Sequence, residues 1–129
     1  MNNQLAHITL LVDDYDRAIE FYTSKLHFEL VEDTKLSESK RWVLVRPAGG
    51  DCCSILLAKA EGKEQESRIG NQTGGRVFLF LQTDDFKREY RNLIDNGITI
   101  VSKPRDEPYG RVVVFSDLYG NKWDLIQPV

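Results

Sequence analysis

The sequence of 129 residues lacks the cysteine pattern of a secreted, disulfide-stabilised protein. It contains only two cysteines, Cys52 and Cys53, and they are adjacent. Neighbouring residues on a strand point to opposite faces, so these thiols are poorly placed to bond to each other. We predict that both are reduced structural residues in a cytoplasmic protein, as a reducing cytosol favours.

Two further absences narrow the choice of partner. The first apolar run ends at Val12 and no lysine or arginine precedes it, so neither a signal-peptide core nor a membrane span is predicted. The net charge is −3 at pH 7, which argues against a nucleic-acid-binding face, because such a face needs cations that displace counterions from phosphates. We expect a small-molecule partner or another protein, with no membrane and no nucleic acid.

What the chain does contain is an internal repeat. Residues 7–15 (HITLLVDDY) align with residues 78–86 (FLFLQTDDF) at an offset of 71, and residues 41–45 align with residues 111–115 at an offset of 70. A repeat at a fixed period predicts two copies of one structural unit. We therefore expect a single domain over residues 1–129, made of module one (4–60), a linker (61–75) and module two (76–128).

Each module reads as a strand, a helix and three further strands. Alternating and β-branched residues predict strands at 6–12, 28–34, 41–46 and 53–59, with a helix from Tyr15 to Leu26. In module two, the same kinds of pattern predict strands at 76–83, 98–102, 111–116 and 122–127, with a helix at 85–96. Residues 61–75 show no sustained period, and residues 103–110 are predicted to form a charged, proline-broken loop.

Some polar residues have a structural interpretation. The pairs Asp13-Asp14 and Asp84-Asp85 precede the two predicted helices, so we predict that they cap these helices. His27 stands where the second copy has Gly97, and we predict a turn residue with a left-handed backbone rather than a catalytic histidine.

The opening residues 6–22 (AHITLLVDDYDRAIEFY), the second copy from Phe78 and the ending 117–127 (DLYGNKWDLIQ) carry a resemblance that spans the chain. The sequence resembles the vicinal oxygen chelate superfamily, which includes glyoxalases, bleomycin-resistance proteins and extradiol dioxygenases. The resemblance implies an α+β fold of two tandem βαβββ modules, forming an open U-shaped mixed sheet with flanking helices. It also implies a homodimer whose clefts are shared between subunits.

The resemblance also implies positions for a metal. In metal-using members, one ligand comes from the first strand and one from the last strand of each module, which places His7 and Asp124 here as metal and catalytic residues. The other two positions fall on Phe78 and on Ser54, or on Leu56 if the strand is shifted by two residues. None of these three is a good ligand, so the sequence predicts at most an incomplete divalent site for Mn, Ni or Zn.

Two functional hypotheses follow. The first is a lyase or isomerase similar to lactoylglutathione lyase, in which His7 and Asp124, with or without a metal, take a proton from the substrate. The alternative for His7 is a satisfied histidine inherited from a metal-binding ancestor. An extradiol dioxygenase is disfavoured, because its iron needs two histidines and a carboxylate, and His27 is the only other histidine.

The second hypothesis is a metal-free protein that binds an antibiotic or toxin without transforming it. Flat aromatic walls suit planar hydrophobic ligands, although only about half of the rings on a strand can face a cleft. Arg41 and Arg111 occupy matching positions and either bind an anionic ligand or begin strands in solvent. The candidate ligand-binding residues are Trp42, Phe78, Tyr109, Arg111 and Trp123, and Phe80 and Phe115 lie on neighbouring positions.

Overall fold

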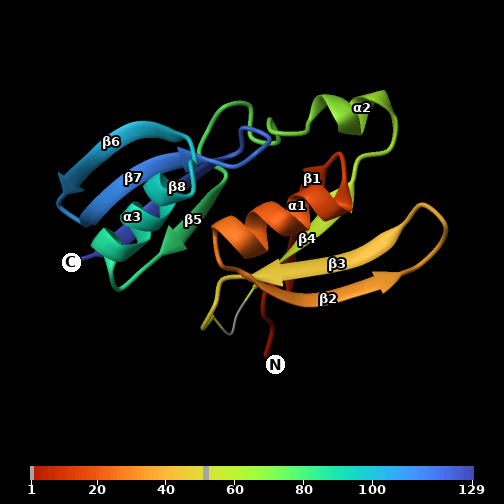
Figure 1. Ribbon diagram of the computed structural model, residues 1–129, viewed down its shortest axis with the longest axis horizontal. Coiled ribbons are helices and arrows are strands. Elements are labelled where there is room, and N and C mark those ends of the chain that lie inside the picture. Colours follow the sequence, from red (N-terminus) through yellow and green to blue (C-terminus); the bar gives the residue numbers. More distant parts are fainter. Residues whose placement is uncertain (1, 51–52) are drawn as a thin grey trace. The chain divides into compact units, whose positions relative to one another are not determined.

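The computed structural model describes residues 2–50 and 53–129, so Cys52 lies outside the described residues. The chain divides into two compact units, Met1–Ile69 and Gly70–Val129 (Figure 1). Each unit contains one four-stranded sheet, with strand order β1-β4-β3-β2 in unit one and β5-β8-β7-β6 in unit two. The α+β fold of two strand–helix–three-strand units is therefore confirmed.

Unit one follows the predicted strands to within one residue. The helical prediction was less accurate, because the last turn is π-helical, with the N–H of Leu26 donating to the carbonyl of Phe21 at 3.3 Å. A short second helix, which the sequence did not predict, lies within the linker segment 61–75. The elements are β1 (His7–Val12), α1 (Tyr15–Glu20), η1 (Phe21–Lys25), β2 (Glu29–Lys35), β3 (Arg41–Arg46), β4 (Ser54–Lys59) and α2 (Gly62–Ser67).

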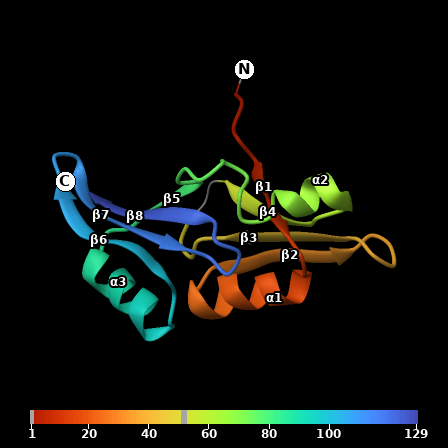
Figure 2. The ribbon, with the colours of Figure 1, turned by 90° about the horizontal axis from the view of Figure 1, so that it is seen from above.

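Side-chain alternation gives the sheet of unit one two different faces. Helix α1 runs along one of them (Figure 2), and this face holds the buried core residues of the strands. The residues between them, which include His7, Thr9, Trp42 and Leu56, point to the other face, here called open face one. The core residues of the first face are Leu10, Val12, Val43, Val45, Ile55 and Leu57.

The capping prediction is confirmed for the second aspartate of each pair, while Asp13 and Asp84 form ion pairs with the side chains of Arg17 and Arg88. The carboxylate of Asp14 accepts the N–H of Arg17 at 2.9 Å, and that of Asp85 accepts the N–H of Arg88 at 3.2 Å. His27 has a φ of 60°, the left-handed conformation that its position predicted.

Unit two corrects one prediction. Residues 103–107 are not a loop but continue an edge strand, in which Pro104 is tolerated because an edge strand has N–H groups that need no partner. The pairing shifts register between Ser102 and Arg105, as a bulge would. The elements are β5 (Leu79–Gln82), α3 (Phe86–Asp95), β6 (Ile100–Glu107), β7 (Gly110–Ser116) and β8 (Lys122–Pro128).

The core of unit two lies between its sheet and α3. Phe115 and Trp123 stack with ring centroids 6.0 Å apart, and both side chains are buried, as is Leu93 of the helix. Alternation then directs Phe80 and Asp124, which pair across β5 and β8, to the opposite side. This side of the sheet is here called open face two.

The segment that joins the units is partly built into unit two. Gly70 packs directly against the carbonyl oxygen of Tyr119, where a Cβ atom would overlap that oxygen. Lys122 donates from Nζ to the carbonyl of Gly75 at 3.0 Å. The first residues of unit two are therefore held by its final turn and strand.

We predict different costs for alanine at two glycines of this segment. Gly70 and Gly74 both have a left-handed φ, of 74° and 67°, but only Gly70 has backbone atoms within reach of a new Cβ. Gly74→Ala should lower the free energy of unfolding by about 1 kcal/mol, the cost of a left-handed L-residue. Gly70→Ala should lower it by about 3 kcal/mol, because the contact with Tyr119 must also give way. Equilibrium urea unfolding measures both, and equal costs would contradict the close packing.

Candidate functional site

Asp124 is a buried carboxyl group on open face two. It lies in β8 between Phe80 of β5 and Val114 of β7. The residue is 6% exposed, and its Oδ1 atom is buried without a hydrogen-bond partner among the described residues. Burial raises the pKa of Asp124, while the nearby positive charge of Arg105 acts in the opposite direction. Such an unsatisfied carboxyl disfavours folding and is typical of a binding or catalytic residue.

Ser102 extends this polar feature across the sheet. Ser102 belongs to β6 and pairs with Val114 of β7, which in turn pairs with Asp124 of β8. Ser102 therefore stands in the same row across the sheet as Asp124 and Phe80. Its hydroxyl is also buried without a hydrogen-bond partner within the described ranges. Sequence reasoning missed Ser102 and Arg105, because they lie on β6 at the border of the segment that was predicted as a loop.

The strand register settles which residue of unit one corresponds to Asp124. Thr9 pairs with Leu56 in unit one, and Phe80 pairs with Asp124 in unit two. Thr9 and Phe80 are equivalent at the repeat offset of 71, so Leu56 is the counterpart of Asp124. Ser54 instead pairs with His7. The alternative with the strand shifted by two residues is therefore the one that the register supports.

The donor set does not fit a metal centre with three protein ligands. Leu56 and Phe78 occupy two of the four positions and offer no donor atom, which leaves His7 in unit one and Asp124 in unit two. Among residues 2–50 and 53–129, no group of three or more His, Cys, Asp and Glu side chains could hold a metal ion. Protein-bound catalytic metals usually have three or more such ligands.

A pocket of about 250 Å³ lies in unit one at the C-terminal end of β1 and β4. Trp42, Thr9, Leu56 and Ala58 contribute its wall from open face one, and Glu61 and Gln65 line it from the region of α2. Trp42 is half-buried, and its ring meets the ring of His7 edge-to-face at a centroid distance of 5.9 Å. Strand and helix residues thus combine an aromatic wall with a polar rim.

Arg41 also lines this pocket but is held by its neighbours. Its guanidinium donates to Asp33 at 2.7 Å and to Asp16 at 3.0 Å, and it lies 5.1 Å from the ring centroid of Tyr15. The hydrogen bonds from Arg41 lower the pKa of Asp33. These contacts give Arg41 a structural role that joins α1, β2 and β3.

The remaining predicted ligand-binding residues are dispersed. Trp123 belongs to the core on the helix side of its sheet, at 2% exposure, so it does not reach open face two. Tyr109 is exposed in the turn between β6 and β7, and Phe78 precedes β5, where its N–H donates to the carbonyl of Lys122. Arg111 pairs with Asp106 on the helix side of unit two.

No helix within the described residues is long and apolar enough to cross a membrane.

Known proteins match the chain over almost its whole length. Residues 4–125 match the profile of the Glyoxalase/Bleomycin resistance protein/Dioxygenase superfamily. An uncharacterized protein of Shewanella frigidimarina is 55% identical over 128 residues, covering 98% of this chain and 95% of that protein. The crystal structure of UcmS2 is 30% identical, with a TM-score of 0.85 over 98% of each chain. TnmS3, an antibiotic binding protein from Streptomyces sp. CB03234, is 28% identical, with a TM-score of 0.80 over 99% of this chain and 98% of its own.

We predict opposite effects for the same substitution at two buried aspartates. Asp124→Asn should raise the melting temperature at pH 7, because a neutral amide is less costly to bury than an unpaired carboxylate. The raised folded-state pKa of Asp124 means that the wild type loses stability as pH rises from the unfolded pKa to the folded pKa. The difference in melting temperature between Asp124→Asn and the wild type should therefore shrink as the pH falls from the folded-state pKa towards the unfolded-state pKa of about 4.

Asp117 is the matched control. Its carboxylate accepts the N–H groups of Tyr119 and Asn121 and the side-chain amide of Asn121, each at 2.9 Å. Asp117→Asn should lower the free energy of unfolding by about 1–3 kcal/mol, because one acceptor becomes a donor. Thermal unfolding followed by circular dichroism measures both variants, and a loss of stability in Asp124→Asn at pH 7 would contradict an unpaired carboxyl group.

Proposed function

Because the chain belongs to the Glyoxalase/Bleomycin resistance protein/Dioxygenase superfamily, we propose that it binds and sequesters a small, planar hydrophobic molecule such as an antibiotic or toxin. In this proposal, binding requires neither a metal nor a chemical step. The observation that carries the proposal is the pocket of about 250 Å³ with Trp42 in its wall.

The chemistry of this pocket suits a planar ligand. An indole ring offers a large flat surface at a small entropic cost, and the edge of His7 restricts the orientation of Trp42. Thr9, Leu56 and Ala58 add a mainly apolar wall, while Gln65 offers polar atoms at the rim. Ligand pockets commonly combine an apolar lining with a few polar groups that fix orientation.

Taken by itself, open face two carries polar groups of a kind that a small molecule would use. The unpartnered oxygen of Asp124 and the hydroxyl of Ser102 stand in a row beside the exposed ring of Phe80. A ligand hydroxyl that donates to Asp124, or a ligand carbonyl that accepts from the hydroxyl of Ser102, would remove part of their desolvation cost. The similarity to TnmS3 supports sequestration, since that protein is an antibiotic binding protein.

A lyase or isomerase is the second candidate, and two residues favour it. His7 is exposed on open face one, and Asp124 has a raised pKa and an unpartnered oxygen. In a homodimer with shared clefts, His7 would meet Asp124 of the partner subunit and act as a base. A divalent ion such as Mn, Ni or Zn would need water or substrate to complete its ligand set.

We further propose a homodimer in the cytoplasm. Phe80 is 67% exposed on open face two, and a second subunit would cover such a ring. Closed dimers are the commonest assemblies of soluble proteins. A chain with only two cysteines suits a reducing compartment.

We predict that Trp42→Ala weakens ligand binding. Against a panel containing an anthraquinone, a naphthoquinone and an acridine, at least one compound should bind the wild type and raise its melting temperature. Trp42→Ala should raise the Kd of that compound by about tenfold, or ~1.4 kcal/mol, because the aromatic wall is lost. Isothermal titration calorimetry measures the Kd.

Leu36→Ala is the matched control for this experiment. Leu36 is 55% exposed after β2 and lies outside the pocket lining, so its loss should leave the Kd unchanged. Equal weakening by both substitutions, or no binding by any compound of the panel, would contradict sequestration in this pocket.

We predict that protein purified without a metal-affinity tag contains less than about 0.2 metal ions per chain, because two ligands bind a divalent ion weakly. Elemental analysis of the wild type and of a His7→Ala, Asp124→Ala double variant measures this content. Near-stoichiometric metal in the wild type that disappears in the double variant would favour the lyase candidate over sequestration.

A further inference from the structure

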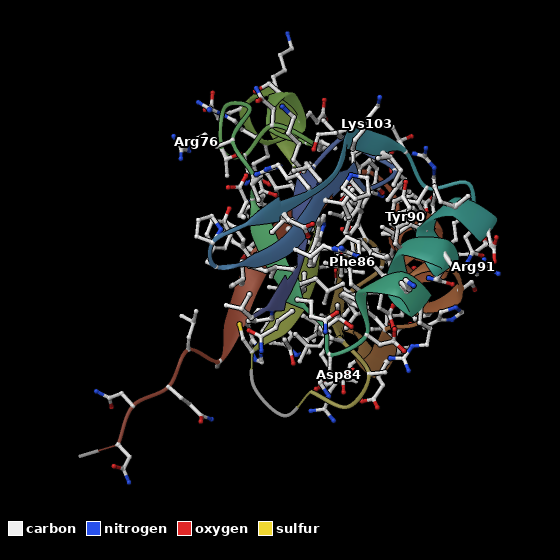
Figure 3. All side chains as sticks on the ribbon, turned by 90° about the vertical axis from the view of Figure 1, so that its left-hand side faces the viewer. Arg76, Asp84, Phe86, Tyr90, Arg91 and Lys103 are labelled. Carbon is white, nitrogen blue, oxygen red and sulfur yellow. The ribbon has the colours of Figure 1, made fainter. Side chains whose placement is uncertain are left out.

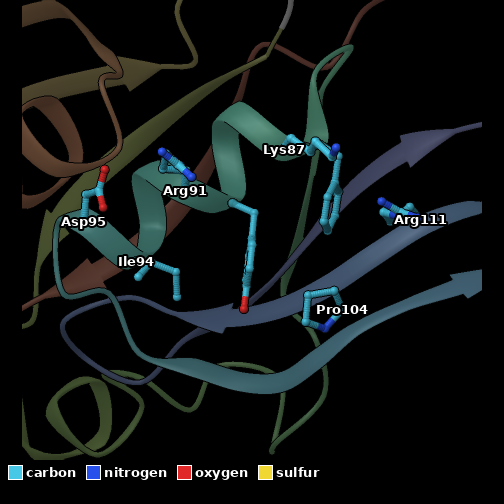
Figure 4. A pocket seen from close by; sticks show the side chains of 8 residues that line it. Lys87, Arg91, Ile94, Asp95, Pro104 and Arg111 are labelled. Carbon is cyan, nitrogen blue, oxygen red and sulfur yellow. The ribbon is translucent and has the colours of Figure 1, made fainter.

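Unit two contains a larger groove on the helix side of its sheet. The groove has a volume of about 620 Å³ and lies between α3 and strands β6 and β7. Figure 4 shows Lys87, Arg91, Ile94 and Asp95 along the helix, with Pro104 and Arg111 on the strand side. Arg111 and Asp124 point to opposite sides of the sheet, so the groove is separate from open face two. Its size suits a drug-sized ligand.

The floor of the groove is aromatic and partly uncovered. Phe86 and Tyr90 stack with their ring centroids 6.0 Å apart and an angle of 17° between the ring planes. Both residues lie on α3, as Figure 3 shows for unit two. Ile94, one turn further along the helix, is 51% exposed. Phe86 itself is buried, at 4% exposure, so the half-buried ring of Tyr90 and the exposed side chain of Ile94 offer the apolar surface against which a planar ring can stack.

The rim of the groove is positively charged, although the whole chain is acidic. The groove is lined by three cationic side chains and only one carboxylate among its lining residues. The cations are Lys87, Arg91 and Arg111, and the carboxylate is that of Asp95. Arg111 shares its charge with Asp106 at 2.8 Å. In the part of the chain that the structure describes, neither Lys87 nor Arg91 has an ion-pair partner.

Arg88, on the same helix, provides a contrast. It does not line the groove, and three carboxylates surround it, those of Asp84, Asp85 and Glu89. The acidic side chains near α3 therefore neutralise the arginine outside the groove, while the cations of the groove stay available for an external anion. This pattern of charge selects an anionic occupant.

We propose that this groove is a second small-molecule site, which binds a planar aromatic carboxylate. The ring lies against Tyr90 and Ile94, and the carboxylate is placed between Lys87 and Arg91. Arg111, whose guanidinium lies 5.9 Å from the ring centroid of Phe86, adds a positive charge on the strand side of the groove. This site is independent of the pocket of unit one.

Naphthalene-2-carboxylate tests the proposal, with naphthalene-2-methanol as its uncharged counterpart. Titration of ¹⁵N-labelled protein should move the amide signals of residues 87–95 and of Arg111 in a saturable way. Naphthalene-2-methanol should bind at least about threefold more weakly, the discrimination that one solvent-screened charge contact supports. Arg91→Gln should raise the Kd of the carboxylate by about threefold and leave that of the alcohol unchanged.

Arg88→Gln removes the same charge from the same helix outside the groove, and it should leave both Kd values unchanged. Trp42→Ala should also have no effect, so a failure of the sequestration proposal and a failure of this one are distinguishable. Equal weakening by Arg91→Gln and Arg88→Gln would overturn the proposal. So would signals that move only around the pocket of unit one, or that move with protein concentration rather than with the probe, as a second copy in the groove would cause.

Discussion

The alternation of side chains across each four-stranded sheet is the constraint on which the other features depend. In unit one, Leu10 and Val12 of β1 are buried on the side of the sheet that α1 covers, and the residues between them face away from the helix. The helix thus covers one face of the sheet with apolar contacts, and the other face stays available for a functional site. His7 and Trp42 meet on that open face because β1 and β3 direct them to the same side. In unit two, the same alternation buries Trp123 and places Asp124, its neighbour in the chain, on the opposite side.

The strand pattern and the helix caps were predictable because they arise from local physical chemistry. Strand boundaries in unit one agree to within one residue, and the aspartates before both helices cap them as expected. Helix α2 was missed because none of its residues is buried, so it has no apolar stripe to recognise. The π-helical turn was missed because its signature is a hydrogen-bond pattern rather than a pattern of hydrophobicity.

The candidate site was predictable only in part. The resemblance to a known superfamily indicated His7 and Asp124, but no residue pattern reveals that an oxygen atom of Asp124 lacks a partner. Ser102 lies at the end of the strand predicted at 98–102, but nothing in the sequence indicates that its hydroxyl is buried without a partner. Trp123 was a candidate for ligand binding until the pairing of β8 fixed its face, since a shift of one residue exchanges the two faces of a strand. The sequence thus identifies the chemical groups that are available, and the strand register decides which of them a ligand can reach.

Pro104 has a consequence for how the protein behaves in a crowded solution. It lies in β6, an edge strand of its sheet, between Ser102 and Arg105, where the pairing of β6 with β7 shifts register. An edge strand with a regular row of free N–H and C=O groups recruits strands from other molecules. Proline removes one of those donors and the bulge bends the row, so β6 is a poor template for intermolecular β-sheet formation. The residue that made the second half of this strand resemble a loop in the sequence therefore also disfavours aggregation along this edge.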